Sequence, residues 1–145
     1  MINESRIDIY DYIEELMKQV CDNVYPMGEP METTEDDVDN GFIVIRVGKL
    51  NDDSEFSCEA YIWARCFVTA YVPKKTRGRL NKTLYKQFED GINGVIKTAE
   101  EEQTNNYFIV PDTILSTDDD ETGQQGNQYH VFTKSFIVAS DYQNE

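Results

Sequence analysis

The chain has 145 residues, of which 39% are hydrophobic, and its 28 Asp and Glu residues outnumber its 13 Lys and Arg residues to give a net charge of −15. This length is typical of one domain with its own hydrophobic core, and the apolar content excludes a wholly disordered chain. The excess of acid disfavours sequence-independent binding to nucleic acid and adhesion to an anionic membrane, because both depend on cationic side chains.

Cysteine usage indicates a reducing compartment rather than a disulfide framework, since the chain has only Cys21, Cys58 and Cys66. Cys58 and Cys66 fall on one predicted strand and lie too far apart along it to form a disulfide, so we expect buried thiols. The first residues lack the basic and apolar regions of a signal peptide, and no apolar run reaches the roughly 18 residues that a membrane helix needs. We therefore expect no membrane partner.

The first predicted element is an amphipathic helix over residues 4–22. Its apolar side chains recur at intervals of three and four residues, which places them on one stripe: Ile9, Ile13, Leu16, Met17, Val20 and Val24. Residues 25–41 are then predicted to form a long exposed loop, because prolines and a glycine interrupt regular structure and acidic side chains keep the segment solvated. A short apolar strand, FIVIRV, follows at residues 42–47.

A long strand is predicted over residues 58–71, because its side chains alternate between two faces along the whole segment. One face has small apolar residues and suits a helix packed closely against it. The opposite face combines large aromatic side chains with charged ones: Glu59, Tyr61, Trp63, Arg65, Phe67, Thr69 and Tyr71. This second face is amphipathic, and we expect it to contact a partner or a second layer of structure.

A second amphipathic helix is predicted over residues 80–101, with an apolar stripe that begins at Leu80 and ends at Ala99. Gly91 and Gly94 interrupt this helix, and each costs up to about 1 kcal/mol relative to alanine. Close packing against another backbone would explain the two glycines, and so would a kink.

The last third of the chain is predicted to contain two strands, at residues 106–115 and 128–142, separated by an exposed acidic loop at residues 116–127. The complete element order is α-β-β-α-β-β, with no internal repeat and no domain linker. The simplest packing is a single α+β domain, in which one antiparallel or mixed four-stranded sheet carries two helices on one face.

Side chains with catalytic potential are few. His130 is the only histidine, and its place in an alternating strand is typical of a sheet surface rather than a catalytic site. No nucleophile-elbow, phosphate-loop or dinucleotide-binding motif occurs. The acidic segment from Asp118 has the first ligands of a calcium loop, but Tyr129 stands where the bidentate carboxylate is required. We therefore expect no catalytic residue, cofactor or metal ion, and a protein that is not an enzyme.

A cluster of cations is the most unusual feature of this acidic chain. The segment YVPKKTRGRLNKTLYK, residues 71–86, contains six of the 13 basic residues and no acid. They are Lys74, Lys75, Arg77, Arg79, Lys82 and Lys86. Cations at the start of a helix oppose its dipole by about 0.3–1 kcal/mol each, so local helix stability does not explain them. Three explanations remain: a solvated loop, contact with an acidic surface of another subunit, or contact with DNA phosphate, which the rest of the chain would repel.

The order of elements resembles that of the tail-terminator and tail-completion proteins of tailed bacteriophages. The resemblance rests on the strand AYIWARCFVTAYVP, the following helix LNKTLYKQFEDGINGVI and the final strand QYHVFTKSFIVASDY. It implies a structural head–tail joining protein of a phage or prophage, assembled in the bacterial host cytoplasm and located in the virion. Such proteins form a homo-oligomeric ring, commonly a hexamer, at the head-proximal end of the tail, with tail-tube or head-connector proteins as further partners.

A ring requires two different patches that meet head to tail. The candidate interface combines the six basic residues with the aromatic side chains Tyr61, Trp63, Phe67 and Tyr71. An acidic lumen would let DNA pass without specific binding. The alternative function is a small monomeric or dimeric binding module that uses the aromatic face of the 58–71 strand to bind a ligand or partner protein. The two functions differ in whether that face is buried between identical subunits.

Overall fold

The computed structural model describes residues 6–28, 32–52, 61–101, 107–111 and 129–141. In chain order, the elements are α1 (Arg6–Met17), β1 (Val24–Pro26), α2 (Glu35–Asn40), β2 (Phe42–Val47), β3 (Asn51–Asp52), β4 (Tyr61–Pro73), the 3-10 turn η1 (Thr76–Gly78), α3 (Lys82–Glu101), β5 (Tyr107–Pro111) and β6 (Tyr129–Asp141). The predicted α+β class is confirmed, and the major elements follow the predicted order.

One mixed sheet organises the molecule, with strand order β1-β2-β4-β6-β5 and with β3 paired to β4. β1 runs parallel to β2, and the other described pairings are antiparallel. The centre of the sheet is the pair β4 and β6, which stay in register along their full length from Tyr61 opposite Asp141 to Pro73 opposite Tyr129. A four-stranded sheet is predicted from the sequence, whereas the structure adds the short strands β1 and β3, which are too brief to produce an alternating pattern.

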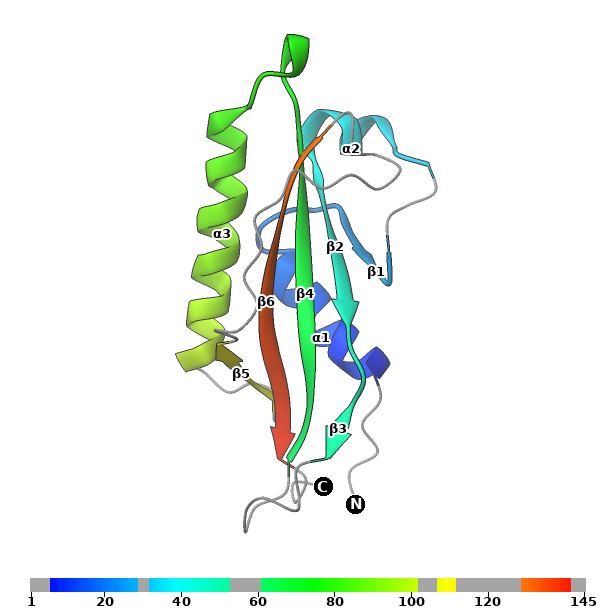
Figure 1. The fold of residues 1–145 in the computed structure, drawn as a ribbon, viewed down its shortest axis with the longest axis vertical. Coiled ribbons are helices and arrows are strands. Elements are labelled where there is room, and N and C mark those ends of the chain that lie inside the picture. The colour runs from blue at the N-terminus through cyan, green and yellow to red at the C-terminus, as the bar shows by residue number, and fades with distance from the viewer. Residues whose placement is uncertain (1–5, 29–31, 53–60, 102–106, 112–128, 142–145) are drawn as a thin grey trace.

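Helices α1 and α3 pack on one face of this sheet, as predicted. The small side chains of β4, including Ala64, Cys66 and Ala70, are completely buried in the same core as Ile13 of α1 and Ile92 of α3. Figure 1 shows α3 running alongside β4 and β6, with α1 behind the sheet. Small residues on the strand let both helices approach the sheet closely, so burial of this face is the main source of stability.

On the opposite face of the sheet, the described residues form a cover at one end only. Five apolar side chains form a second, smaller core there: Phe42, Val44, Tyr71, Tyr129 and Val131. Phe42 stacks on Tyr71 with ring centroids 4.5 Å apart and planes 10° from parallel, and Tyr129 meets both rings edge-on. Aromatic pairs in these geometries contribute about 0.5–1.5 kcal/mol beyond their buried area.

Residues 25–41 are not the continuous exposed loop that the sequence predicts. Part of this segment pairs as β1, and another part forms α2. Thr34 caps α2: its hydroxyl accepts from the Asp37 amide at 3.1 Å, while the Asp37 carboxylate accepts from the Thr34 amide at 3.0 Å. This capping box satisfies amides that would otherwise lack partners, so an acidic segment becomes helical. The predicted loop at 116–127 lies outside the described residues.

Helix α3 is a single helix of 20 residues, and its two glycines have different surroundings. A Cβ atom added at Gly91 would lie 2.9 Å from Cγ1 of Val20, whereas one added at Gly94 would have no neighbour within 4 Å. Close packing therefore explains Gly91, although the neighbour is the Val20 side chain rather than a backbone. Nothing in the structure explains Gly94.

We expect Cys66 to resist alkylation in the folded protein. Its side chain is completely buried, and burial raises the pKa of the thiol to about 12. Because only the thiolate reacts, iodoacetamide at pH 8 is expected to modify Cys66 at least about a hundredfold more slowly in the native protein than in guanidinium chloride. Peptide mass spectrometry measures both rates. Equal rates would show that this face of β4 is open to solvent.

Candidate functional site

The connection between β4 and α3 forms an exposed basic tip, residues 74–79. It projects beyond the end of the sheet (Figure 1). Two backbone hydrogen bonds shape it, from the Lys75 amide to the Arg79 carbonyl at 2.8 Å and from the Gly78 amide to the Lys75 carbonyl at 2.9 Å. Lys75, Arg77 and Arg79 are exposed, and Lys74 is half-buried. The predicted cations therefore stand together on a protruding turn.

Arg77 occupies the centre of the basic tip in a left-handed conformation, with φ 66° and ψ 25°. For a residue other than glycine, this left-handed backbone conformation costs about 1–2 kcal/mol of conformational free energy. No ion pair joins a cation of the basic tip to an acidic side chain in the described part of the chain. The arginine is thus presented outward at some cost in local stability, without a partner in its own described fold.

Lys82 and Lys86 extend the basic surface along the first turns of α3, where both are exposed. The helix begins after Asn81, whose side-chain oxygen accepts from the Leu84 amide at 3.3 Å. A neutral cap satisfies this amide without introducing an acid near the cations. All six basic residues singled out in the sequence therefore lie at one end of the β4–α3 unit.

The predicted aromatic face is divided into two parts. Trp63 and Phe67 are half-buried on the face opposite α1 and α3, while Tyr71 is only 4% exposed within the second core. Tyr71 is therefore not accessible to a partner in this conformation. The Tyr61 side chain lies outside the described parts. Residues on the same side of one strand therefore have different surroundings. Among the described residues, α2 and the aromatic cluster cover only the end that contains Tyr71.

Side chains from several strands complete the open sheet face, which we define as Arg46, Trp63, Arg65, Phe67, Val110 and Ile137. Arg46 stands opposite Phe67 in the register of β2 and β4, and Arg65 stands opposite Ile137 in β6. Arg46 and Val110 are exposed. The sequence signal for Arg46 is that it is the sole charged residue in FIVIRV, but only the register shows which aromatic residue it faces.

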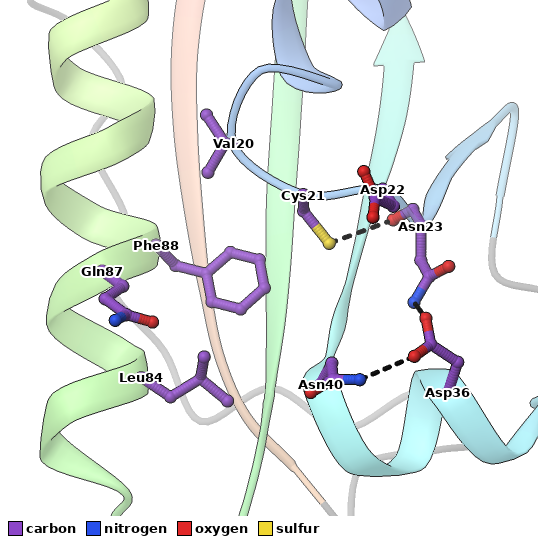
Figure 2. Close-up of a pocket in the computed structure, with 9 residues that line it drawn as sticks. All are labelled: Val20, Cys21, Asp22, Asn23, Asp36, Asn40, Leu84, Gln87 and Phe88. Carbon is purple, nitrogen blue, oxygen red and sulfur yellow. Dashed lines mark hydrogen bonds between the residues drawn. The ribbon is translucent and has the colours of Figure 1, made fainter.

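A pocket of about 270 Å³ lies between the turn after α1, the end of α2 and α3 (Figure 2). Its walls are lined by Val20, Cys21, Asp22, Asn23, Asp36, Asn40, Leu84, Gln87 and Phe88. Apolar side chains from α3 and from the turn after α1 form one wall, and polar side chains from the turn and from α2 form the other. Sequence reasoning missed this pocket, because its acidic wall belongs to segments that are 13 residues or more apart in the chain.

Two amides hold the Asp36 carboxylate in place at the pocket. Asn23 Nδ2 donates to Asp36 Oδ2 at 2.6 Å, and Asn40 Nδ2 donates to Asp36 Oδ1 at 2.6 Å. Asn23 Nδ2 also contacts the Gly41 carbonyl at 3.3 Å. These bonds fix the carboxylate relative to the turn after α1. Asp22 adds a second acid, and no cationic side chain lines the pocket.

The Cys21 thiol in this pocket is poorly suited to act as a nucleophile. Burial raises its pKa above the ordinary value, and the negative charges of Asp22, Asp36 and Asp37 add to the effect, against a lowering by the hydrogen bond to the Asn23 carbonyl. The thiol therefore stays protonated at neutral pH, and the thiolate is the reactive form. The pocket therefore does not present an activated cysteine.

Within the described ranges, no group of three or more His, Cys, Asp or Glu side chains is arranged to hold a metal ion. None of the helices among the described residues has the length and apolar character needed to cross a membrane. The sequence matches no protein-family model, and no curated protein matches it either. Among the described residues, the features that bear on function are the basic tip, the open sheet face and the pocket.

Proposed function

We propose that this protein is a structural subunit of a phage or prophage particle, a tail-terminator or neck component whose copies join head to tail in a ring. The observation that supports the proposal is the basic tip, which projects from an acidic chain and has no acidic partner among the described residues. A protruding cationic patch and a separate acidic surface are the two complementary patches that a closed ring needs. The open sheet face supplies a further surface for a tail-tube or head-connector protein.

We expect self-association that weakens at high salt, because exposed charges are screened within about 10 Å at 0.1 M ionic strength. Light scattering across protein concentration and salt measures the mass, and electron microscopy of the same sample shows whether rings close. Reversing Lys74, Lys75, Arg77 and Arg79 to Glu is expected to reduce the oligomer mass. The matched control replaces Lys18, Lys49, Lys97 and Lys134 with Glu. These lysines are exposed outside the basic tip, so the control variant has the same net charge as the tip variant.

Equal loss of association in both variants would assign the effect to net charge rather than to the basic tip. An unchanged mass in the tip variant would remove the tip from the interface. Incorporation into a particle is tested separately: mass spectrometry of purified virions from the producing strain is expected to find the chain in the tail fraction. Its absence from particles that have complete tails would end the proposal.

A second candidate function is a binding module that uses the open sheet face. Half-buried Trp63 and Phe67 beside an exposed Arg46 favour this candidate, because aromatic and arginine side chains dominate binding energy at protein interfaces. Trp63 is the only tryptophan, so its fluorescence reports on this face alone. A spectrum that shifts with protein concentration favours burial between identical subunits. A spectrum that shifts only when a tail or connector protein is added favours binding to that partner.

A further inference from the structure

The pocket beside α3 has the chemistry of a receptor for one cationic side chain. Asp22 and Asp36 stand on one side of it, while Val20, Leu84 and Phe88 form an apolar wall that suits a hydrocarbon stem. Its volume of about 270 Å³ lies just below the roughly 300–1,000 Å³ that is typical of small-molecule sites. The pocket therefore fits an arginine or lysine side chain better than a nucleotide or a larger cofactor.

The Asp36 carboxylate is oriented for this role before any partner arrives. Each of its oxygens accepts one hydrogen bond, from Asn40 or from Asn23 (Figure 2). A carboxylate offers about four acceptor positions in total, so each oxygen keeps room for another donor. Guanidinium groups donate in pairs to the two oxygens of one carboxylate, and this geometry favours arginine over lysine.

The basic tip supplies a matching arginine. Arg77 is exposed at the centre of a convex turn, and the two backbone hydrogen bonds within residues 74–79 hold that turn in shape. Figure 1 shows the tip directed away from the body of its own subunit. An exposed arginine on a projecting turn is accessible to a second copy, and the tip and the pocket are different patches, as a head-to-tail contact requires.

We propose that the pocket formed by the turn after α1, α2 and α3 receives the Arg77 side chain of a second copy, with its guanidinium on Asp36 and its stem along Phe88 and Leu84. This inference builds on the proposed assembly function and names the contact between subunits. Asp22 and Asp36 are exposed in the single chain, and a docked neighbour would exclude water from the ion pair and strengthen it.

A charge swap tests the contact, with sedimentation equilibrium of the full chain as the measurement. Arg77→Glu and Asp36→Lys are each expected to weaken self-association at least about tenfold, because each leaves a charge facing a like charge. The double variant is expected to recover to within about threefold of the original, since the pair is restored with opposite polarity. The control pairs Arg77→Glu with Asp39→Lys, an exposed site on α2 that does not line the pocket, and no recovery is expected.

Folding is checked by circular dichroism, and Asp36→Asn replaces Asp36→Lys if the latter disturbs the Asn23 and Asn40 bonds. In the Asp36→Asn background, Arg77→Glu is expected to cause a smaller further loss than in the original chain, because Arg77 no longer faces a carboxylate there. If the double variant associates more weakly than either single variant, with the two losses adding, the proposed contact is overturned. A discrete oligomer whose mass is unchanged by either single variant would overturn the contact while leaving the ring proposal intact. A strict monomer at every concentration would overturn the contact, and detection in virions would then decide the proposed function by itself. Methylguanidinium that shifts the amide signals of Asn23 and Asn40 in that monomer would instead assign the pocket to a free cation.

Discussion

Replacing Gly41 with alanine is expected to lower the free energy of unfolding by about 3 kcal/mol or more. Gly41 ends α2 with φ 83° and ψ 177°, a conformation that is essentially restricted to glycine. An added Cβ would also lie 2.6 Å from the Tyr71 carbonyl oxygen and 3.0 Å from the Phe88 ring. The carbonyl oxygen belongs to β4, which is paired on both sides at Tyr71. The strand therefore cannot shift easily to make room for the added methyl group.

Chemical denaturation in urea measures this effect, and Gly94→Ala is the matched control. Gly94 lies within α3 with no atom near an added Cβ, so the same substitution there is expected to stabilise the protein by up to about 1 kcal/mol. Similar changes at the two sites would contradict the packing described at the end of α2. Because Gly41 adjoins the pocket through its carbonyl bond with Asn23, its alanine variant is also expected to weaken self-association.

Replacing Asp37 with alanine is expected to cost about 2–3 kcal/mol of stability. Asp37 is completely buried, and its Oδ2 accepts from the Tyr25 hydroxyl at 2.6 Å and from the Thr34 amide at 3.0 Å. Alanine removes the capping box and leaves two donors without their acceptor. The control is Asp39→Ala on the same helix, where the side chain is exposed and a change within about 0.5 kcal/mol is expected.

Tyr25→Phe extends this experiment, because it removes the second partner of the same bond. The double variant is expected to lose less free energy of unfolding than the sum of the two single variants. Each single variant leaves one partner of the hydrogen bond unpaired, whereas the double variant removes both partners. Strictly additive losses would show that the Tyr25–Asp37 bond contributes nothing to stability. Thermal or urea unfolding of the four proteins completes the cycle.

The Tyr25 hydroxyl also supplies a pH readout of this cluster. Burial, and then the hydrogen bond to Asp37, raise the pKa of Tyr25 to about 12. An unfolded tyrosine ionises near pH 10, so the unfolded chain loses its proton first and stability falls as the pH rises from about 10 toward 12. This loss is expected to be smaller in Asp37→Ala, where the Tyr25 pKa moves back toward its ordinary value. Absorbance of tyrosinate follows the titration.

Local patterns in the sequence determined the main layer of the fold. The strict alternation of side chains in β4 specified which face is small and apolar, because successive residues of a strand point to opposite sides. The same alternation predicted β6, and the spacing of three and four residues predicted α1 and α3. These patterns depend only on residues that are close together in the chain, so they can be recognised without knowing any tertiary contact. They are sufficient for the α+β class and for two helices on one face.

Only the tertiary structure decided what covers the sheet face opposite α1 and α3, and which side chains surround the acidic residues of α2. Trp63 and Tyr71 occupy the same side of β4, yet one is half-exposed and the other buried, since alternation specifies a side and not its cover. Asp37 is buried because Tyr25 and Thr34 supply donors to it, a pairing that composition cannot indicate. The pocket around Asp36 likewise joins three separate segments. This arrangement depends on long-range packing of the chain, which no short stretch of sequence encodes.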